Sequence, residues 1–385
     1  MLASSTLYEK HDSFVGVRHR SFPGDVGDRV RELVHRIERS KLRLSAEKLE
    51  VVRQACEELL GKRDVAPYQS FSLQSYVVEE INRLPDELLP RYLWYRYRYE
   101  AWPERKVLDQ FPPCLQIEPT SVCNYRCVFC YQTDRHFTAG ANSQMGMMPL
   151  ELFQSLIDQA QGLCEAVTLA SRGEPSLCPD LKAMLAYAAG KFLAFKINTN
   201  ASHLDEALSH AILQADVNTV VFSIDAASEP AYSQLRVGGK LAQVVEHVER
   251  FRRIQLAHYP KARTITRVSG VQVPGAADLE AMTRRWGDLV DQVAFVKYNP
   301  WENTYERPVN DIEQPCSDLW RRMFVWWDGR VNPCDVDYRS TLAVGDARTE
   351  RLADLWQGER YARLRTAHVA RARRDCSPCN RCTVV

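Results

Sequence analysis

Apolar residues between positions 29 and 60 recur at intervals of three, four and seven residues. This spacing puts them on one face of an α-helix, and Ser45, a typical N-cap residue, divides the segment into two helices. Residues 92–102 then intersperse tyrosines and tryptophans with arginines. Such a stretch forms either a stacking surface for a sugar or base or a cover over one end of a larger domain. The large area that aromatic rings bury favours the cover.

Beyond residue 110 the pattern changes to short β-rich runs that alternate with amphipathic segments. The runs predict strands at 115–118, 167–170, 195–199, 219–225, 264–272 and 292–296. The amphipathic segments predict helices at 150–161, 181–189, 204–214, 241–254 and 277–289. Six strands alternating with helices are typical of an α/β fold with a parallel sheet, open or closed into a barrel. Such folds gather their chemistry at the C-terminal ends of the strands.

The last part of the chain follows a third pattern. Asp328 and Gly329 separate two apolar runs, which predicts a tight β-hairpin, and a helix is expected over 352–370. We therefore divide the chain into a helical N-terminal extension (1–110), an α/β core (111–310) and a small C-terminal hairpin and helix domain (311–385).

Composition excludes several classes of protein. The 385 residues contain 50 basic and 49 acidic side chains, so the net charge of +1 does not favour nucleic-acid binding. No run of about eighteen apolar residues predicts a membrane span, and the first twenty residues lack the apolar core of a signal peptide. A cytoplasmic location is the default expectation.

Twelve cysteines direct attention to metal chemistry, since an intracellular chain keeps its thiols reduced. Cys123, Cys127 and Cys130 follow the first predicted strand on a single loop. Three thiolates at this spacing suit three irons of a cubane cluster and leave the fourth iron open. A structural zinc site fits less well, because it needs four protein ligands and usually a second pair at similar spacing.

This loop resembles the C-x3-C-x-aromatic-C signature of radical S-adenosylmethionine (SAM) enzymes, with Phe129 as the aromatic residue beside adenine. The resemblance implies a [4Fe-4S] cluster whose open iron chelates SAM and whose electron cleaves it to a 5'-deoxyadenosyl radical. It also implies a partial (β/α)6 barrel.

Three further motifs follow the next three predicted strands in the order that this family shows. Gly173 and Glu174 resemble the family's Gly-Glu-Pro segment, which binds the SAM ammonium group. Thr199 and Ser223 lie in segments similar to those that help to bind SAM. Arg172 departs from the family, which often has a glycine at that position.

The C-terminal cysteines resemble the SPASM/twitch extension of radical SAM enzymes, and their spacing is close to that of twitch-type aminocyclitol dehydrogenases. Five thiols are too few for two clusters, so the resemblance implies one auxiliary [4Fe-4S] cluster. Its expected ligands are Cys316, Cys334, Cys376 and Cys379, with Cys382 as an alternative fourth ligand. A four-thiolate zinc site that steadies the C-terminus would fit the same residues.

These features predict a radical SAM oxidoreductase that dehydrogenates a sugar, aminocyclitol or related metabolite, with a flavodoxin- or ferredoxin-type electron donor. A ribosomal-peptide maturase is the second hypothesis, and an epimerase or decarboxylase of a small metabolite is the third. An electron carrier without catalysis would leave the strand-end motifs unexplained. Arg267, on the fifth predicted strand, is a candidate for cofactor binding or the substrate mouth, and Glu302 is the simplest candidate proton acceptor.

Overall fold

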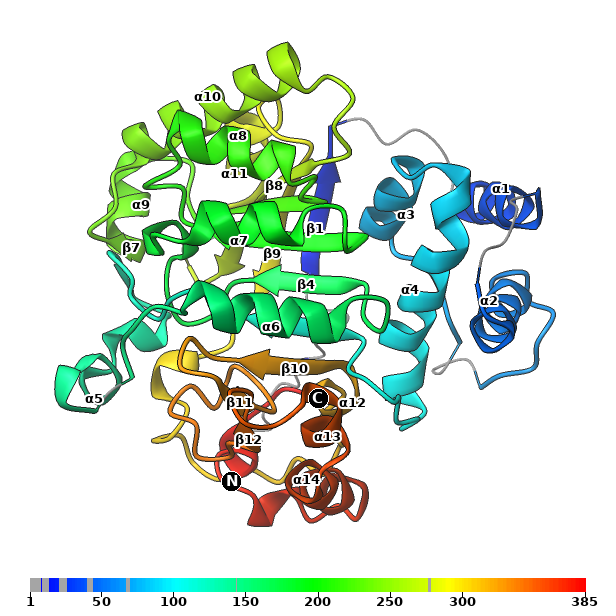
Figure 1. The fold of residues 1–385 in the computed structure, drawn as a ribbon. Coiled ribbons are helices and arrows are strands. Elements are labelled where there is room, and N and C mark those ends of the chain that lie inside the picture. The colour runs from blue at the N-terminus through cyan, green and yellow to red at the C-terminus, as the bar shows by residue number, and fades with distance from the viewer. Residues whose placement is uncertain are drawn as a thin grey trace.

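The computed structural model describes residues 8, 14–20, 26–39, 44–66, 70–142, 144–275 and 278–385. A ten-stranded sheet runs through the molecule in the order β1-β9-β8-β6-β5-β4-β2-β10-β11-β12 (Figure 1). Six neighbouring strands are parallel and form the predicted partial barrel. They are β2 (Cys114–Ile117), β4 (Ala166–Leu169), β5 (Ala194–Thr199), β6 (Thr219–Ser223), β8 (Ile265–Gln272) and β9 (Gln292–Lys297).

Amphipathic helices cover the outer face of this sheet (Figure 1). They are α6 (Leu150–Ala160), α7 (Leu181–Ala188), α8 (Glu206–Gln214), α9 (Glu229–Leu235), α10 (Leu241–His258) and α11 (Leu279–Trp286). Strand β5 shows how the sequence separates the two faces, because Phe195 and Ile197 are buried in the apolar core, whereas Lys196 and Asn198 line a cavity inside the barrel. The barrel interior is therefore polar.

The N-terminal extension closes the end of the barrel where the strands begin. It comprises α1 (Val26–Arg39), α2 (Ala46–Leu59), α3 (Ser75–Asn82), a 3-10 turn (Asp86–Leu88) and α4 (Leu89–Glu104). Ser45 caps α2 by accepting a hydrogen bond from the backbone of Lys48, as its sequence predicts. Helix α4 contains the aromatic and arginine-rich stretch, and Arg91 within it binds Glu165 just before β4. The prediction that these rings cover one end of the core is confirmed.

Two additions extend the sheet at its edges. Strand β1 (Phe14–His19) pairs antiparallel with β9 and was not predicted. At the other edge β10 (Arg322–Val325) pairs in parallel with β2 and continues into β11 (Arg330–Asn332) and β12 (Gly345–Asp346), so the predicted hairpin is present.

The remaining elements are short or belong to the C-terminal region. The predicted helix 352–370 is divided at Gly358 into α13 (Leu352–Gln357) and α14 (Glu359–Val369). The others are β3 (Arg126–Cys127), α5 (Arg135–Thr138), β7 (Arg236–Val237), α12 (Asp318–Arg321) and 3-10 turns at Tyr131–Thr133, Gly140–Asn142, Pro175–Leu177, Trp301–Asn303, Arg373–Asp375 and Cys379–Arg381. In the ranges described, every helix is too short or too polar to cross a bilayer.

Candidate active site

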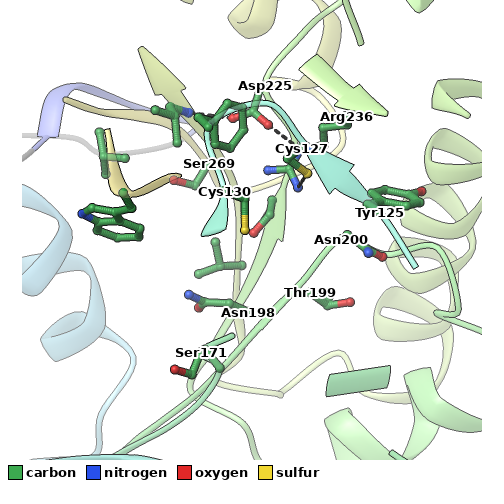
Figure 2. Close-up of a pocket in the computed structure, with 18 of the residues that line it drawn as sticks. Tyr125, Cys127, Cys130, Ser171, Asn198, Thr199, Asn200, Asp225, Arg236 and Ser269 are labelled. Carbon is green, nitrogen blue, oxygen red and sulfur yellow. Dashed lines mark hydrogen bonds and ion pairs between the residues drawn. The ribbon is translucent and has the colours of Figure 1, made fainter. Parts of the chain in front are cut away.

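The loop after β2 brings three thiols to a cavity of about 340 Å³ at the C-terminal ends of the barrel strands. Figure 2 shows two of them, Cys127 and Cys130. Cys123, Cys127 and Cys130 all line the cavity, and the pairing of β3 with β7 holds the loop in place. Burial, with a smaller contribution from Glu174, raises the pKa of Cys123 to about 12, and burial also raises the pKa of Cys130. The thiols therefore stay protonated at neutral pH until a metal displaces the proton.

Arg236 supports this loop, although the sequence analysis did not single it out. Its Nη1 lies 3.7 Å from the Cys127 Sγ, and its Nε donates to the buried carboxylate of Asp225 (Figure 2). The two consecutive glycines after Val237 are the feature of the sequence that indicates a close contact between this segment and another part of the chain. A Cβ on Gly239 would lie 2.9 Å from the Tyr125 ring, so the chain can pass beneath the cysteine loop only with glycine there.

Glu174 lies at the centre of a hydrogen-bond network at the ends of β4 and β5. Its Oε1 accepts from the Thr199 hydroxyl at 2.6 Å, and its Oε2 accepts from the Asn200 backbone at 2.6 Å. Gly173 is sterically required, because a Cβ there would lie 2.3 Å from the carbonyl oxygen of Thr120. Thr199 thus orients Glu174, whose carboxylate remains on the cavity lining as an acceptor for a cationic ligand.

Other cavity side chains present polar atoms without a protein partner among the described residues. The Ser171 hydroxyl and the Asn198 amide oxygen are buried and unpaired. Ser223 lines the same cavity at the end of β6, and Phe129 lines it from the cysteine loop. The two unpaired oxygens line the same cavity as the thiols and Glu174, as a polar ligand would require.

The two remaining sequence candidates occupy different places. Arg267 does line the cavity, deeper in the barrel than Ser269, which follows it on β8. Glu302 does not line it. The 3-10 turn at Trp301–Asn303 directs its carboxylate to the Tyr298 hydroxyl and a separate hollow beside Tyr305, so the predicted position of Glu302 in the substrate mouth is corrected.

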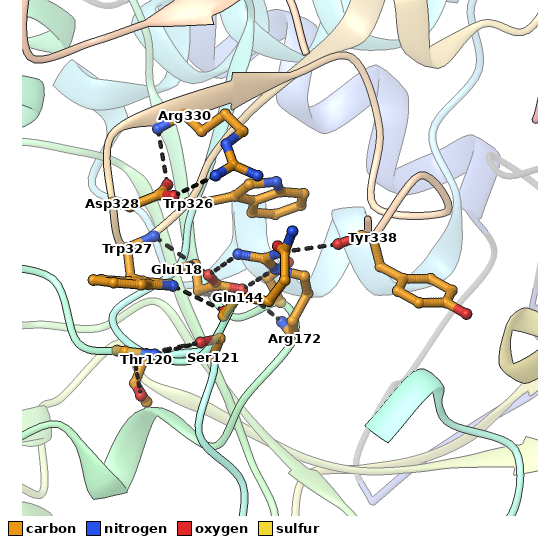
Figure 3. Close-up of polar contacts among 12 residues, drawn as sticks. Glu118, Thr120, Ser121, Gln144, Arg172, Trp326, Trp327, Asp328, Arg330 and Tyr338 are labelled. Atoms are coloured by element: carbon orange, nitrogen blue, oxygen red, sulfur yellow. Dashed lines mark hydrogen bonds and ion pairs between the residues drawn. The ribbon is translucent and has the colours of Figure 1, made fainter. Parts of the chain in front are cut away.

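Arg172, the departure from the family pattern, is fully buried in a polar network (Figure 3). Its guanidinium binds both carboxylate oxygens of Glu118, at 2.6 and 2.7 Å, and donates to the Tyr338 carbonyl at 2.9 Å. It also lies over the Trp326 ring, 4.2 Å from the centroid. The side chain thus connects the Gly173–Glu174 loop to β2 and to the C-terminal region.

A second group of thiols surrounds a small cavity of about 30 Å³ in the C-terminal region. Its lining contains Cys316, Cys334, Cys379 and Cys382 but not Cys376. Arg373 fixes the tail by donating to the carbonyls of Cys379 and Cys382 at 3.0 and 2.7 Å. The four thiols brought together thus include Cys382, which the sequence analysis ranked as an alternative, in place of Cys376.

Trp301 lies between the two groups of thiols. Its ring stacks on Tyr131, which follows Cys130, with centroids 6.4 Å apart and an interplanar angle of 19°. It also lines the barrel cavity and packs against the apolar cluster that contains Cys382 and contacts Cys334. A single side chain therefore spans the region between the cavity and the second thiol group.

Two family models match the chain in these regions. The radical SAM superfamily model matches residues 117–267, and an iron-sulfur cluster-binding domain model, SPASM, matches residues 316–383. The chain is a radical SAM enzyme with a SPASM/twitch extension. This enzyme therefore uses SAM, a [4Fe-4S] cluster and auxiliary iron-sulfur chemistry, and the zinc alternative for the C-terminal site is not retained.

Relatives of this radical SAM enzyme differ in their reactions. It is 22% identical over 306 residues to the tungsten-containing aldehyde ferredoxin oxidoreductase cofactor-modifying protein of Pyrococcus furiosus, covering 65% of this chain and 82% of that protein. It is 23% identical over 188 residues to the mycofactocin maturase MftC of Mycobacterium ulcerans, covering 47% and 48%. The structure of Streptococcus suis SuiB bound to the precursor peptide SuiA aligns at a TM-score of 0.50 with 14% identity, covering 82% of this chain and 78% of SuiB. That likeness shows the shared fold.

The residues of this radical SAM enzyme fit its cofactors. The Glu174 carboxylate and the unpaired Ser171 and Asn198 oxygens accept hydrogen bonds, as the ammonium and hydroxyl groups of SAM require. In the described ranges no three Cys, His, Asp or Glu side chains converge closely enough to share one metal ion. Both thiol groups instead surround a cavity, and the matched families place a cluster of several irons there.

Proposed function

We propose that this radical SAM enzyme is a dehydrogenase that oxidises a C–H bond, most simply of a carbinol, in a compact metabolite. The observation that carries the proposal is the position of Trp301, which lines the reaction cavity and packs against the apolar cluster of the auxiliary thiols. An electron acceptor so close to the substrate favours net oxidation over return of the hydrogen atom. A substrate that loses a hydrogen atom, a proton and an electron becomes a ketone.

Different residues of the barrel would bind the cluster and SAM. Cys123, Cys127 and Cys130 would hold the first cluster, and Glu174, oriented by Thr199, would accept the SAM ammonium group. When bound, the cofactors supply a 5'-deoxyadenosyl radical for hydrogen abstraction and an acceptor for the remaining electron. Phe129 and Ser223 line the cavity beside this group, which supports their assignment to the adenosine part of SAM.

The shape of the cavity supports a small substrate. Its volume of about 340 Å³ lies at the lower end of the range for ligand sites and has to accommodate SAM as well. Helices α3 and α4 close the barrel below it through contacts such as that of Arg83 with the Thr264 carbonyl. A single sugar-sized molecule, or one side chain of a larger one, suits this space.

We propose Cys316, Cys334, Cys379 and Cys382 as ligands of the auxiliary cluster, which leaves Cys376 as a free thiol. His368 accepts a hydrogen bond from the backbone of Cys316 through Nδ1. Its Nε2 has no partner among the described residues, and the side chain lines the same cavity. Burial lowers the pKa of His368 to about 3, so the ring is neutral and its Nε2–H would be available to a cluster sulfur.

A peptide maturase is the second candidate, because the similar protein MftC is named a maturase and SuiB binds the precursor peptide SuiA. An exposed segment of a peptide could place one side chain in the cavity. A flavodoxin- or ferredoxin-type donor would serve either reaction.

The test is a turnover experiment on the anaerobically reconstituted enzyme in deuterated buffer. The enzyme is supplied with reductant, SAM and cell extracts that contain candidate substrates. We expect 5'-deoxyadenosine together with a product two mass units lighter that reacts with a carbonyl reagent. Formation of an isomer of the substrate that is one mass unit heavier, because it carries one solvent deuterium on carbon, would instead establish an epimerase. A modified peptide as the only product would favour the maturase.

A further inference from the structure

The charges along the cavity are not balanced. Two of the arginines that line it have carboxylate partners, since Arg236 binds Asp225 and Arg172 binds Glu118. Deeper in the barrel Lys196 and Arg267 also line the cavity. The described residues offer neither of these two cations an ion pair. Because a buried charge without an ion-pair partner is costly, this end of the cavity is suited to a negatively charged ligand.

The Arg267 side chain is held in place by its neighbours, and one of its guanidinium nitrogens has no hydrogen-bond partner among the described residues. Its guanidinium lies beside the rings of Phe14 and Tyr76, 5.3 Å from each centroid, and its Nε donates to the Gln292 side chain at 2.6 Å. Gln292 is itself fixed by donating to Glu79. The Arg267 residue is only 4% exposed, and its Nη2 is buried without a partner. A preorganised guanidinium with a free donor suits a carboxylate or phosphate.

Lys196 provides a second positive charge nearby. It lies inside β5 opposite Thr219, while Arg267 on β8 lies opposite Val221, so one β6 strand separates the two side chains. Lys196 has no hydrogen-bond acceptor among the described residues. The carboxylate of Glu80 on α3 acts electrostatically on both cations, but it forms an ion pair with neither and accepts its hydrogen bond from the Tyr92 hydroxyl. Both cations remain available to a ligand that enters from the C-terminal ends of the barrel strands.

We propose that Arg267 and Lys196 bind an anionic group of the substrate, a carboxylate or a phosphate. The two cations would hold the anionic group at the inner end of the cavity. The carbon to be oxidised would then lie between that group and the cysteine loop. The inference rests on the proposed function and names its substrate class as an acidic metabolite. An aminocyclitol is disfavoured, because a protonated amine would meet two cations.

Small probes test the site without knowledge of the whole substrate. Acetate, inorganic phosphate and the neutral acetamide would be titrated calorimetrically into the reconstituted, SAM-bound enzyme at pH 7. We expect acetate or phosphate to bind at least tenfold more tightly than acetamide, and the tighter of the two identifies the anionic group. Arg267→Gln and Lys196→Gln should each weaken anion binding by about tenfold without affecting acetamide.

Matched variants distinguish the loss of these two binding groups from the loss of a positive charge anywhere on the protein. Arg267→Lys keeps the charge and should retain part of the preference, which also covers the case in which Arg267→Gln fails to fold. Lys182→Gln removes an exposed lysine on α7 and should leave anion binding unchanged. Equal binding of acetate and acetamide, absence of anion binding, or an equal effect of Lys182→Gln would overturn the inference. The proposed dehydrogenation is judged separately, by the oxidation state of the product, so the two can fail independently.

Discussion

The carboxylate of Glu118, at the end of β2, receives two hydrogen bonds from the guanidinium of Arg172, in the loop after β4. Both side chains are almost fully buried. Arg172 comes immediately before Gly173 and Glu174 in the sequence and also binds the Tyr338 carbonyl. The ion pair thus fixes the loop that would bind the SAM ammonium group relative to the C-terminal region.

Removal of Arg172 should destabilise the enzyme strongly. In Arg172→Ala the Glu118 carboxylate stays buried without its counterion, which typically costs about 3–5 kcal/mol of the free energy of unfolding. Urea denaturation of the wild type and variant measures this difference. Arg172→Met combined with Glu118→Leu should cost less than Arg172→Ala alone, because no charge remains buried. An equal or larger loss in the double variant would contradict this account. Arg348→Ala, in an exposed ion pair with Asp346, is the matched control and should have little effect.

Glu174 and Thr199 should affect SAM binding to different extents. Glu174→Gln removes a charged acceptor and should weaken SAM binding by about 10- to 100-fold. Thr199→Val removes one of the hydrogen bonds that orient Glu174 and leaves those from Asn200 and Ser176, so we expect a loss of about fivefold. Calorimetric titration of the reconstituted enzyme with SAM measures both. Glu151→Gln, on the exposed surface of α6, is the control. An equal loss in both variants would mean that Thr199 contacts SAM directly.

Iron content distinguishes the two candidate ligand sets at the C-terminus. The wild type should contain about eight irons per chain after reconstitution, four for each cluster. Cys382→Ser should lower the content to about four, whereas Cys376→Ser should retain about eight, because Cys376 does not line the cavity. The reverse result would restore the ligand set expected from the sequence.

Anion binding in the barrel should weaken as the pH rises. Burial, followed by the charges of Arg267 and Arg322, lowers the pKa of Lys196 to about 8, while Cys114 and Glu80 act in the opposite direction. Protonated Lys196 is the form that binds an anion, so acetate affinity should be highest below pH 8 and should fall by about tenfold by pH 9.5. Titrations between pH 7 and 9.5 test this, and Lys196→Gln should remove most of the dependence. An unchanged slope in that variant would assign the titration to another group.

The sequence could predict those parts of the site that depend on local spacing. Cys123, Cys127 and Cys130 lie on one loop, whereas Glu174 follows a strand of a parallel sheet and Thr199 and Ser223 are the last residues of two others. Because parallel strands end at the same edge, their order alone brings these residues together. The hairpin at Gly329 was recognisable for the same reason, since two residues determine its turn.

Features that depend on distant contacts were not predictable. Strand β1 pairs with β9, which lies far from it in the sequence, and no local pattern specifies that partner. The spacing of the last three cysteines is equal, so it cannot decide between Cys376 and Cys382. In the folded chain, with the tail held by bonds from Arg373 to the carbonyls of Cys379 and Cys382, the Cys382 side chain lines the cavity and that of Cys376 does not. Glu302 follows the last barrel strand, but a 3-10 turn redirects its side chain.

The pairing of β10 with β2 has a consequence for how the enzyme can be shortened. All four residues of β2 align with residues of β10, and the strand on the other side of β2 is β4. A chain that ended before residue 311 would leave β2 as an unprotected edge strand, with a row of free amide and carbonyl groups beside the cysteine loop. Such edges recruit strands from other molecules. Truncation should therefore yield aggregates rather than a smaller SAM-cleaving enzyme. The barrel and its C-terminal addition thus form one folding unit that cannot be separated.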